Sequence, residues 1–159
     1  MEYRVRVERN KLKFAAAHFA TYDGKLEPLH GHNYAVSIDV AGTLTNDAWV
    51  CDFSTLKSAG KALCDVLDHK FLLQRDSREL QIDEAETNWK VRFLDRGFVF
   101  AKADVLPLPI DNTTAERIAE WFVARLRDDL RARGATNLTS ISVEVEEAPG
   151  QSGSATVDM

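Results

Sequence analysis

Cysteine is scarce in this chain of 159 residues, and its scarcity excludes two kinds of site. Cys51 and Cys64 are the two copies, each in an apolar setting, and they lack the CxxC spacing of many thiolate metal sites. Small secreted domains that depend on disulfides use far more cysteine. We therefore expect neither a disulfide framework nor a thiolate zinc site, assign both thiols to packing, and expect a reducing, cytoplasmic location.

Long apolar runs are also absent. A membrane-spanning helix needs roughly 18 or more consecutive apolar residues, and no segment of the sequence reaches that length. The N-terminal segment MEYRVRVERNKLKF alternates apolar and charged residues, where a secretion signal would have a continuous apolar stretch. We expect neither membrane insertion nor secretion.

An excess of positive charge is the third missing feature. The net charge is -5, whereas proteins that bind nucleic acid gather lysine and arginine on one surface, so we expect no nucleic-acid partner. A small anionic substrate is compatible with this charge, because Lys13, Lys25, Lys70 or Arg75 could contact a phosphate, although for any one of them a solvated surface position is the better explanation. With 45% hydrophobic and 28% charged residues, the chain is expected to form one globular domain over residues 1–159.

Histidine is sparse as well, but its distribution is informative. All four copies lie in the first half of the chain: His18, the pair His30 and His32, and His69. A single histidine on an apolar face is more often a satisfied core residue than a metal ligand. A metal site therefore needs support from the pattern of the surrounding residues.

The pattern around three of these histidines predicts a metal site. After His30 and His32 the even positions are apolar and the odd ones polar, as in a half-buried strand. The stretch that ends at His18 alternates in the same way, so strands at about residues 3–18 and 32–44 would bring three imidazoles to one place. Three protein ligands with one open position are usual for catalytic zinc, whereas structural zinc generally has four. We predict catalytic zinc, with iron or nickel as alternative occupants.

Turn signals, apolar periodicity and capping residues divide the rest of the chain. The parity of the first strand changes at residues 8–11, which predicts a bulge or a turn there. The second helix carries the spacing Thr113-x-x-Glu116, which is typical of a capping box. The further predicted elements are a turn at Asp23-Gly24, a helix from Asp52 or Ser54 to Asp68-His69, a β-hairpin of residues 89–93 and 98–100 around Asp95-Arg96-Gly97, a break at residues 107–109, a helix from Thr113 or Thr114 to Gly134, and a final strand through Ile141 to Glu147.

Glu147 is unusual within the last predicted strand. It shares its parity with Ile141, Val143 and Val145, and so continues an apolar face. A buried carboxylate needs hydrogen-bond donors, and a ligand with paired N–H groups could supply them. The alternative with equal support is that the strand has already ended and Glu147 is solvated.

Six segments of the chain resemble the 6-pyruvoyltetrahydropterin synthases and their bacterial relatives, the 6-carboxytetrahydropterin synthases. They occur in the family's order and cover nearly the whole chain except about residues 75–106. Each segment alone is a weak signal, whereas all of them in order are specific. The segments are Phe14-Ala15-Ala16-Ala17-His18, His30-Gly31-His32-Asn33-Tyr34, Asp52-Phe53 with Leu56-Lys57, Leu67-Asp68-His69-Lys70, Asn112-Thr113-Thr114-Ala115-Glu116, and Glu147-Ala148-Pro149.

The resemblance implies a fold and an assembly. The fold is an α+β tunnelling fold (T-fold), in which a four-stranded antiparallel sheet carries two helices on one face, here with an extra hairpin segment. Subunits of this kind form trimers that stack into homo-hexamers, with pterin sites between subunits. The resemblance also implies that His18, His30 and His32 hold Zn²⁺.

Five further site residues follow from the same resemblance. Glu147 would anchor the amino-pyrimidinone edge of the pterin through two hydrogen bonds, and Asp68 and His69 would form the acid–base pair. Thr113 and Thr114 would line the pterin pocket. Two of these assignments have structural alternatives, because Asp68-His69 could simply end the first helix and Thr113 could simply cap the second.

One departure from the family bears on the product. The usual catalytic cysteine lies a few residues before the HGH motif, but no cysteine occurs between His18 and His30. Glu27 stands three residues before His30 instead. This resembles the third type of the family, in which glutamate replaces the cysteine and the enzyme stands in for dihydroneopterin aldolase. The expected activity is then a zinc-dependent lyase of folate biosynthesis that converts 7,8-dihydroneopterin triphosphate to 6-hydroxymethyl-7,8-dihydropterin, with Glu27 as the base.

Two kinds of alternative stay open from the sequence. Within the family, the product could be 6-pyruvoyltetrahydropterin or 6-carboxytetrahydropterin, on the biopterin or queuosine route. From a different class, the chain could be a non-catalytic oligomeric protein that binds zinc and a pterin without converting it.

Overall fold

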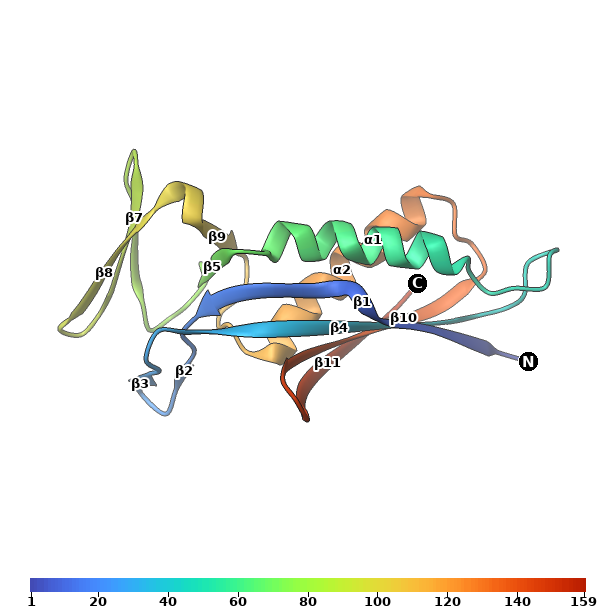
Figure 1. Ribbon diagram of the computed structural model, residues 1–159, viewed down its shortest axis with the longest axis horizontal. Helices are drawn as coiled ribbons and strands as arrows, with labels where there is room; N and C mark the ends of the chain where they lie inside the picture. Colours follow the sequence, from blue (N-terminus) through green and yellow to red (C-terminus); the bar gives the residue numbers. More distant parts are fainter.

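The computed structural model describes residues 1–159, in which a six-stranded sheet carries two helices on one face (Figure 1). Four neighbouring strands are antiparallel, whereas β5 pairs parallel with β1 and β9 parallel with β5. In spatial order the strands are β11 (Gln151–Asp158), β10 (Leu138–Ala148), β4 (His30–Gly42), β1 (Tyr3–His18), β5 (Lys70–Gln74) and β9 (Val105–Leu108). The predicted α+β class and the four antiparallel strands are confirmed, and two short parallel strands extend the sheet beyond β1.

The central pair of strands, β1 and β4, sets the positions of the histidines. In its register His18 lies opposite His30, and Ala16 lies opposite His32. The register shifts beyond Glu8, where Arg9 and Asn10 have positive φ angles of 66° and 55°. The predicted bulge is therefore confirmed. It shifts the buried positions from odd numbers, as at Val7, to even numbers, and this even pattern continues to His18.

The two helices begin at capping residues and cover the same apolar face of the sheet. Asp52, one of the two predicted caps, begins α1 (Phe53–Leu67) by accepting a hydrogen bond from the Thr55 N–H. Thr114 caps α2 (Ala115–Ala132). Both helices contribute to one core of 27 buried residues together with β1, β4 and β10. Neither helix has the length and apolar character needed to cross a membrane.

The predicted capping box of the second helix is wrong. The capping hydroxyl is that of Thr114, which accepts from the Arg117 N–H, one position later than the box requires. The Thr113 hydroxyl donates instead to the Phe19 carbonyl at 3.2 Å and is fully buried. Thr113 therefore connects α2 to the segment after β1.

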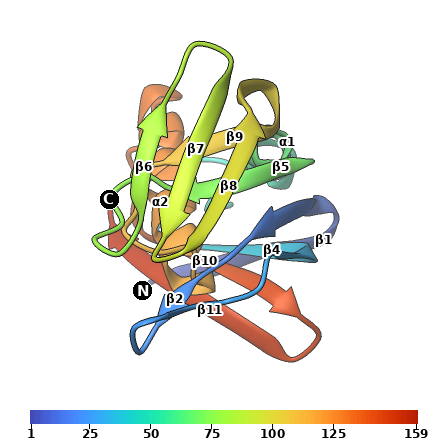
Figure 2. The same ribbon diagram turned by 90° about the vertical axis from the view of Figure 1, so that its left-hand side faces the viewer.

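A separate three-stranded sheet occupies one end of the molecule, and Figure 2 looks onto it. It consists of β6 (Gln81–Glu84), β7 (Asn88–Phe93) and β8 (Arg96–Ala101). The predicted hairpin is confirmed as β7 and β8, but β6 was not predicted. The turn consists of Leu94 and Asp95, so Arg96 is the first residue of β8 and lies opposite Phe93, not within the turn.

The segment after β8 differs from its prediction. A 3₁₀ helix, η1 (Lys102–Asp104), leads into β9, which includes Pro107. The predicted break at residues 107–109 is therefore wrong at its start. Proline lacks the N–H that a central strand needs, but β9 is the outermost strand of its sheet, where proline is tolerated.

A small hairpin connects β1 to β4. Its strands are β2 (Thr21–Tyr22) and β3 (Lys25–Leu26), joined by Asp23 and Gly24 with φ angles of 49° and 69°. Two consecutive residues with positive φ are the mark of a tight hairpin turn, so the predicted turn is confirmed. This hairpin carries the chain from the end of β1 to Glu27.

Candidate metal centre

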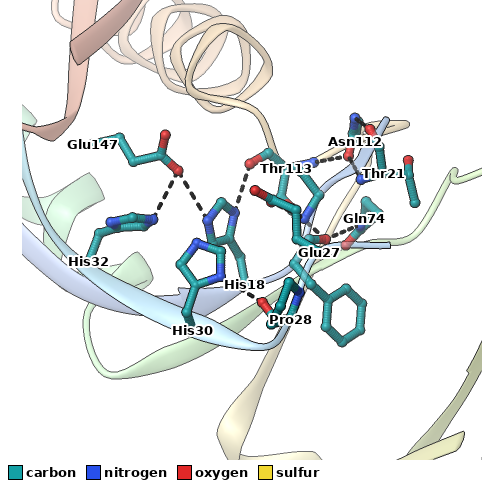
Figure 3. A network of polar contacts seen from close by, with 12 residues as sticks. His18, Thr21, Glu27, Pro28, His30, His32, Gln74, Asn112, Thr113 and Glu147 are labelled. Carbon is teal, nitrogen blue, oxygen red and sulfur yellow. Dashed lines mark hydrogen bonds and ion pairs between the residues drawn. The ribbon is translucent and has the colours of Figure 1, made fainter. Parts of the chain in front are cut away.

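Four side chains converge where β1, β4 and β10 come together (Figure 3). They are His18 at the end of β1, His30 and His32 on β4, and Glu147 near the end of β10. Their ligand atoms all lie within 4.8 Å of one another, and the ring centroids of the three histidines are 4.7 to 5.2 Å apart. The structure thus brings together all three histidines that parity placed on one face.

Glycine between the two histidines of β4 has a steric reason. A Cβ atom at Gly31 would lie 3.2 Å from the carbonyl oxygen of Ala16 on the neighbouring strand. That distance is tighter than an ordinary van der Waals contact, so a side chain here would require the neighbouring strand to move by a few tenths of an ångström. The HGH motif is therefore compatible with close pairing of the two strands.

Backbone carbonyls orient two of the imidazoles. Nδ1 of His18 lies 2.9 Å from the Thr113 carbonyl oxygen, and Nδ1 of His30 lies 2.6 Å from the Pro28 carbonyl oxygen. Because a carbonyl can only accept, each Nδ1 carries the hydrogen and each Nε2 keeps a lone pair. Metal-ligating histidines commonly have this arrangement. Burial lowers the pKa of His18, which favours the neutral form that binds metals.

The Glu147 carboxylate faces His18 and His32. Its Oε1 lies 3.1 Å from Nε2 of His18 and 3.1 Å from Nε2 of His32, and both nitrogens are buried and make no hydrogen bond. A nitrogen lone pair and a carboxylate oxygen repel each other unless a proton or a cation lies between them. Three imidazole nitrogens and one carboxylate are a donor set that suits Zn²⁺ and related divalent ions. The residues therefore fit a metal ion.

The position of Glu147 also decides between its two sequence interpretations. Strand β10 continues to Ala148, and the Glu147 side chain is 27% exposed and directed at the histidines. The interpretation in which the strand has ended and Glu147 is simply solvated is wrong. Its Oε2 has no protein partner and is free to accept from a ligand.

Glu27 lies next to this group without belonging to it (Figure 3). Its N–H donates to the Ala20 carbonyl at 3.0 Å, and its Oε1 accepts from the Ala20 N–H at 2.8 Å. Burial raises the pKa of Tyr34, and the nearby charges of Glu147 and Glu27 raise it further. The Tyr34 ring meets His18 and His32 edge-on at 6.2 and 5.5 Å. Figure 3 shows Glu27 and Glu147 flanking the histidines as separate side chains.

Asp68 and His69 form a pair at the end of α1. Asp68 accepts from the Ala15 N–H and from Nδ1 of His69, each at 2.8 Å, and the bond from Ala15 is the main reason that the pKa of Asp68 is lowered. Asp68 is also the residue at which α1 ends. Asp68 and His69 therefore both end the helix and form a hydrogen-bonded pair. The His69 side chain is 82% exposed. It lies outside the four-residue group, but it lines the same surface cavity of about 540 Å³ as His32.

The two threonines have structural contacts of their own. Thr113 orients His18 through its carbonyl and contacts Phe19 through its hydroxyl, while the Thr114 hydroxyl caps α2. Two polar residues near them had not been singled out from the sequence. The Asn112 amide exchanges two hydrogen bonds with the backbone of Thr21, and the buried Gln74 donates to the Phe19 carbonyl at 2.6 Å. Asn112 lies in the NTTAE segment that resembles the family, and this resemblance is the one sequence feature that could have indicated its role.

Both cysteines have packing roles, as predicted. Cys64 is fully buried in α1, and Cys51 packs at the edge of the same cluster. Burial raises the pKa of both thiols, that of Cys64 to about 12. Neither is a reactive thiolate near neutral pH.

The family model described as 6-pyruvoyl tetrahydropterin synthase matches residues 7–157. The chain belongs to this family. Its membership confirms the predicted resemblance and the T-fold, and it makes the chain an enzyme of the tetrahydropterin synthase type, whose members act on pterins.

Individual relatives of the pterin synthase family support this. The 6-carboxy-5,6,7,8-tetrahydropterin synthase of Haemophilus influenzae is 35% identical over 126 residues, which cover 75% of this chain and 80% of that protein. The crystal structure of 6-pyruvoyl tetrahydropterin synthase from Plasmodium vivax superimposes with a TM-score of 0.93 at 32% identity and covers 100% of this chain and 99% of that one. Another structure, of a P. vivax variant in which a glutamate described as the catalytic residue is replaced by alanine, gives a TM-score of 0.94 at 31% identity over the same shares.

The names of these relatives bear on the predicted product. They correspond to the two alternative products of the family, 6-carboxy- and 6-pyruvoyltetrahydropterin, better than to the hydroxymethylpterin that Glu27 led us to expect. The comparisons establish the family and the enzyme class. The product has to be argued from the residues of the site.

Proposed function

We propose that this protein is a zinc-dependent lyase that acts on 7,8-dihydroneopterin triphosphate, uses Glu27 as its base and releases 6-hydroxymethyl-7,8-dihydropterin. The observation that carries the proposal is the carboxylate of Glu27 beside the three histidines, while Cys64 is buried in the core and Cys51 packs against it. The P. vivax relative, whose replaced glutamate is described as the catalytic residue, supports a carboxylate in this role.

The proposed chemistry divides between the metal and the protein. A divalent cation held by His18, His30 and His32 would lower the pKa of a substrate hydroxyl and stabilise negative charge on its oxygen. The free oxygen of Glu27 accepts the proton of that hydroxyl. The adjacent carbon–carbon bond then breaks, its electron pair passes to the carbon that stays on the pterin, and the departing fragment is an aldehyde that keeps the phosphates.

A proton donor completes this cycle. The carbon left on the pterin takes a proton from His69, whose ring Asp68 holds through Nδ1.

The exposed His69 ring of one chain fits a pterin site formed between subunits, so the proposal includes the homo-hexamer that the resemblance implies. We also propose a cytoplasmic location. Thr113 and Thr114 contribute by placing His18 and the start of α2 at the pocket wall.

The names of the relatives favour a second candidate, formation of 6-carboxy- or 6-pyruvoyltetrahydropterin from the same substrate. The proton transfers in pyruvoyl formation suit a thiol better than a carboxylate, and no cysteine lies in the segment between His18 and His30. A protein that binds zinc and pterin without turnover is the candidate outside enzyme function.

Product analysis tests the proposal directly. We expect the zinc-loaded protein to convert 7,8-dihydroneopterin triphosphate to 6-hydroxymethyl-7,8-dihydropterin, identified by liquid chromatography and mass spectrometry, and the chelated protein to leave the substrate intact. A 6-pyruvoyl or 6-carboxy product would replace our assignment with the second candidate. Tight pterin binding with no conversion would favour the non-catalytic alternative.

Glu147→Gln separates two roles of that carboxylate. If Glu147 anchors the pterin, we expect the variant to retain its zinc on three imidazoles and to lose about 100-fold in pterin affinity, because charge-assisted hydrogen bonds each contribute roughly 1.5–3 kcal/mol. Zinc content by plasma mass spectrometry and pterin affinity by fluorescence titration give the two readouts. Glu146→Gln, one position away on the opposite parity, is the matched control. Loss of zinc with unchanged pterin affinity would make Glu147 a metal ligand instead.

A further inference from the structure

The backbone around Glu27 is held from two sides. On the inner side, Glu27 exchanges two hydrogen bonds with Ala20, one through its N–H and one through Oε1. Oε2 of Glu27 has no protein partner, so one carboxylate oxygen is fixed and the other is free. The direction of the free oxygen therefore depends on the positions of the neighbouring peptide groups.

On the outer side, the carbonyls of Leu26 and Glu27 are directed at one guanidinium group. Nη1 of Arg96 donates to the Leu26 carbonyl at 2.8 Å, and Nη2 donates to the Glu27 carbonyl at 3.4 Å. These two nitrogens of one planar group contact two consecutive carbonyls, which restrains the peptide plane between them. Arg96 lies 70 residues from Leu26 in the sequence, so this restraint is tertiary.

Arg96 is itself anchored to the body of the protein. It is the first residue of β8, and its guanidinium lies over the Phe98 ring at 5.5 Å. Phe98 and Phe100 pack on Phe19 and Phe71, with ring centroids 4.9 Å apart for Phe98–Phe19 and 4.1 Å for Phe100–Phe71. The β7–β8 turn reaches toward the β2–β3 hairpin in both overall views (Figures 1 and 2). The three-stranded sheet is thus joined to the segment that follows His18.

We infer that Arg96 is a positioning residue for Glu27, and that the β6–β8 sheet serves to hold the Glu27 segment against the metal centre. This inference rests on the proposed function for the role of Glu27. The β6–β8 sheet lies within about residues 75–106, the segment that the family motifs do not cover, and this role connects it to the site. A guanidinium donates to the two carbonyls from two nitrogens held in one rigid plane, whereas a lysine ammonium has a single nitrogen on a flexible stem, so arginine restrains the segment more tightly.

Arg96→Ala tests the inference with two independent readouts. We expect hydrogen–deuterium exchange at the amides of Ala20 and Glu27 to become about 10-fold faster, while zinc content and the exchange of α1 and α2 stay unchanged. We expect kcat to fall by about 10- to 100-fold, the cost of a base displaced by about 1 Å, with KM within about twofold. Arg96→Lys should recover part of kcat. Arg92→Ala, which removes the same charge from β7 of the same sheet, is the matched control.

The double variant ties the effect to the base. In a Glu27→Gln background, Arg96→Ala should cost no further turnover, because two residues that act through one group are not additive. Two results would overturn the inference. One is an exchange rate of the Glu27 segment in Arg96→Ala equal to that in Arg92→Ala, and the other is a full additional loss of turnover in the double variant. If Glu27→Gln alone left turnover unchanged, the proposed base would be wrong, and the exchange measurement would still decide whether Arg96 holds the segment.

Discussion

Replacing His18 by alanine is expected to abolish metal binding and turnover together. His18 is 1% exposed, its ring is oriented by the Thr113 carbonyl, and its lone pair faces the centre of the four-residue group. Removal of an outer hydrogen-bond partner of a ligand already costs about 10- to 100-fold in metal affinity, and removal of the ligand itself should cost more. After dialysis against a weak chelator, plasma mass spectrometry should find less than a tenth of the wild-type zinc, with no product formed.

His69→Ala is the matched control for this result. It also removes one imidazole, but His69 lies outside the group whose ligand atoms converge. We expect this variant to keep its zinc and to lose turnover only. A His18→Ala protein that is folded and retains stoichiometric zinc would show that the histidine group is not the metal site.

The part of the fold that was predictable is the part with a regular sequence period. Strand β1 alternates up to His18, and strand β4 alternates from His30, so parity alone placed the histidines on the buried face. The cap at Asp52 and the turn at Asp23-Gly24 are local signals in the same sense, because their hydrogen bonds and φ angles involve neighbouring residues.

The missed strands lack such a period. Strand β5 is the run KFLLQ, in which Phe71, Leu72, Leu73 and Gln74 are all buried, so its two faces do not differ in sequence. Its partners on β1 are Ala16 and Ala17, more than 50 residues away. Strand β11 has little apolar character, and its pairing with β10 depends on the turn in which Gly150 has a φ of 80°. Pairing that depends on distant partners leaves little trace in the local pattern.

The site divides in the same way. The histidines and Glu147 stood out because polar residues at apolar positions break an expected pattern. Gln74 and Arg96 act through hydrogen bonds from a side chain to a backbone carbonyl 55 to 70 residues away. A carbonyl is present at every residue, so no sequence pattern marks which one will be contacted. The restraint on the Glu27 segment is therefore visible only in three dimensions.

Glu27→Gln is expected to stop turnover while leaving the structure of the site intact. Glutamine has nearly the same shape, and its amide oxygen can accept the Ala20 N–H that Oε1 accepts now, so the segment should stay in place. The amide cannot take a proton, and general acid–base catalysis by one side chain contributes about 100- to 10,000-fold to rate. We expect kcat to fall by that factor, measured as product per enzyme by mass spectrometry, with zinc content, pterin affinity and melting temperature unchanged.

Glu86→Gln, an exposed position between β6 and β7, controls for the loss of one negative charge. Turnover of Glu27→Gln within about twofold of wild type would exclude Glu27 as the base, and the reason for expecting hydroxymethylpterin would disappear with it. A large loss of zinc in the same variant would have a different meaning, because Glu27 would then act on the metal and not on the substrate proton. The proposed mechanism requires that Glu27→Gln binds the metal and the pterin normally and fails to break the carbon–carbon bond.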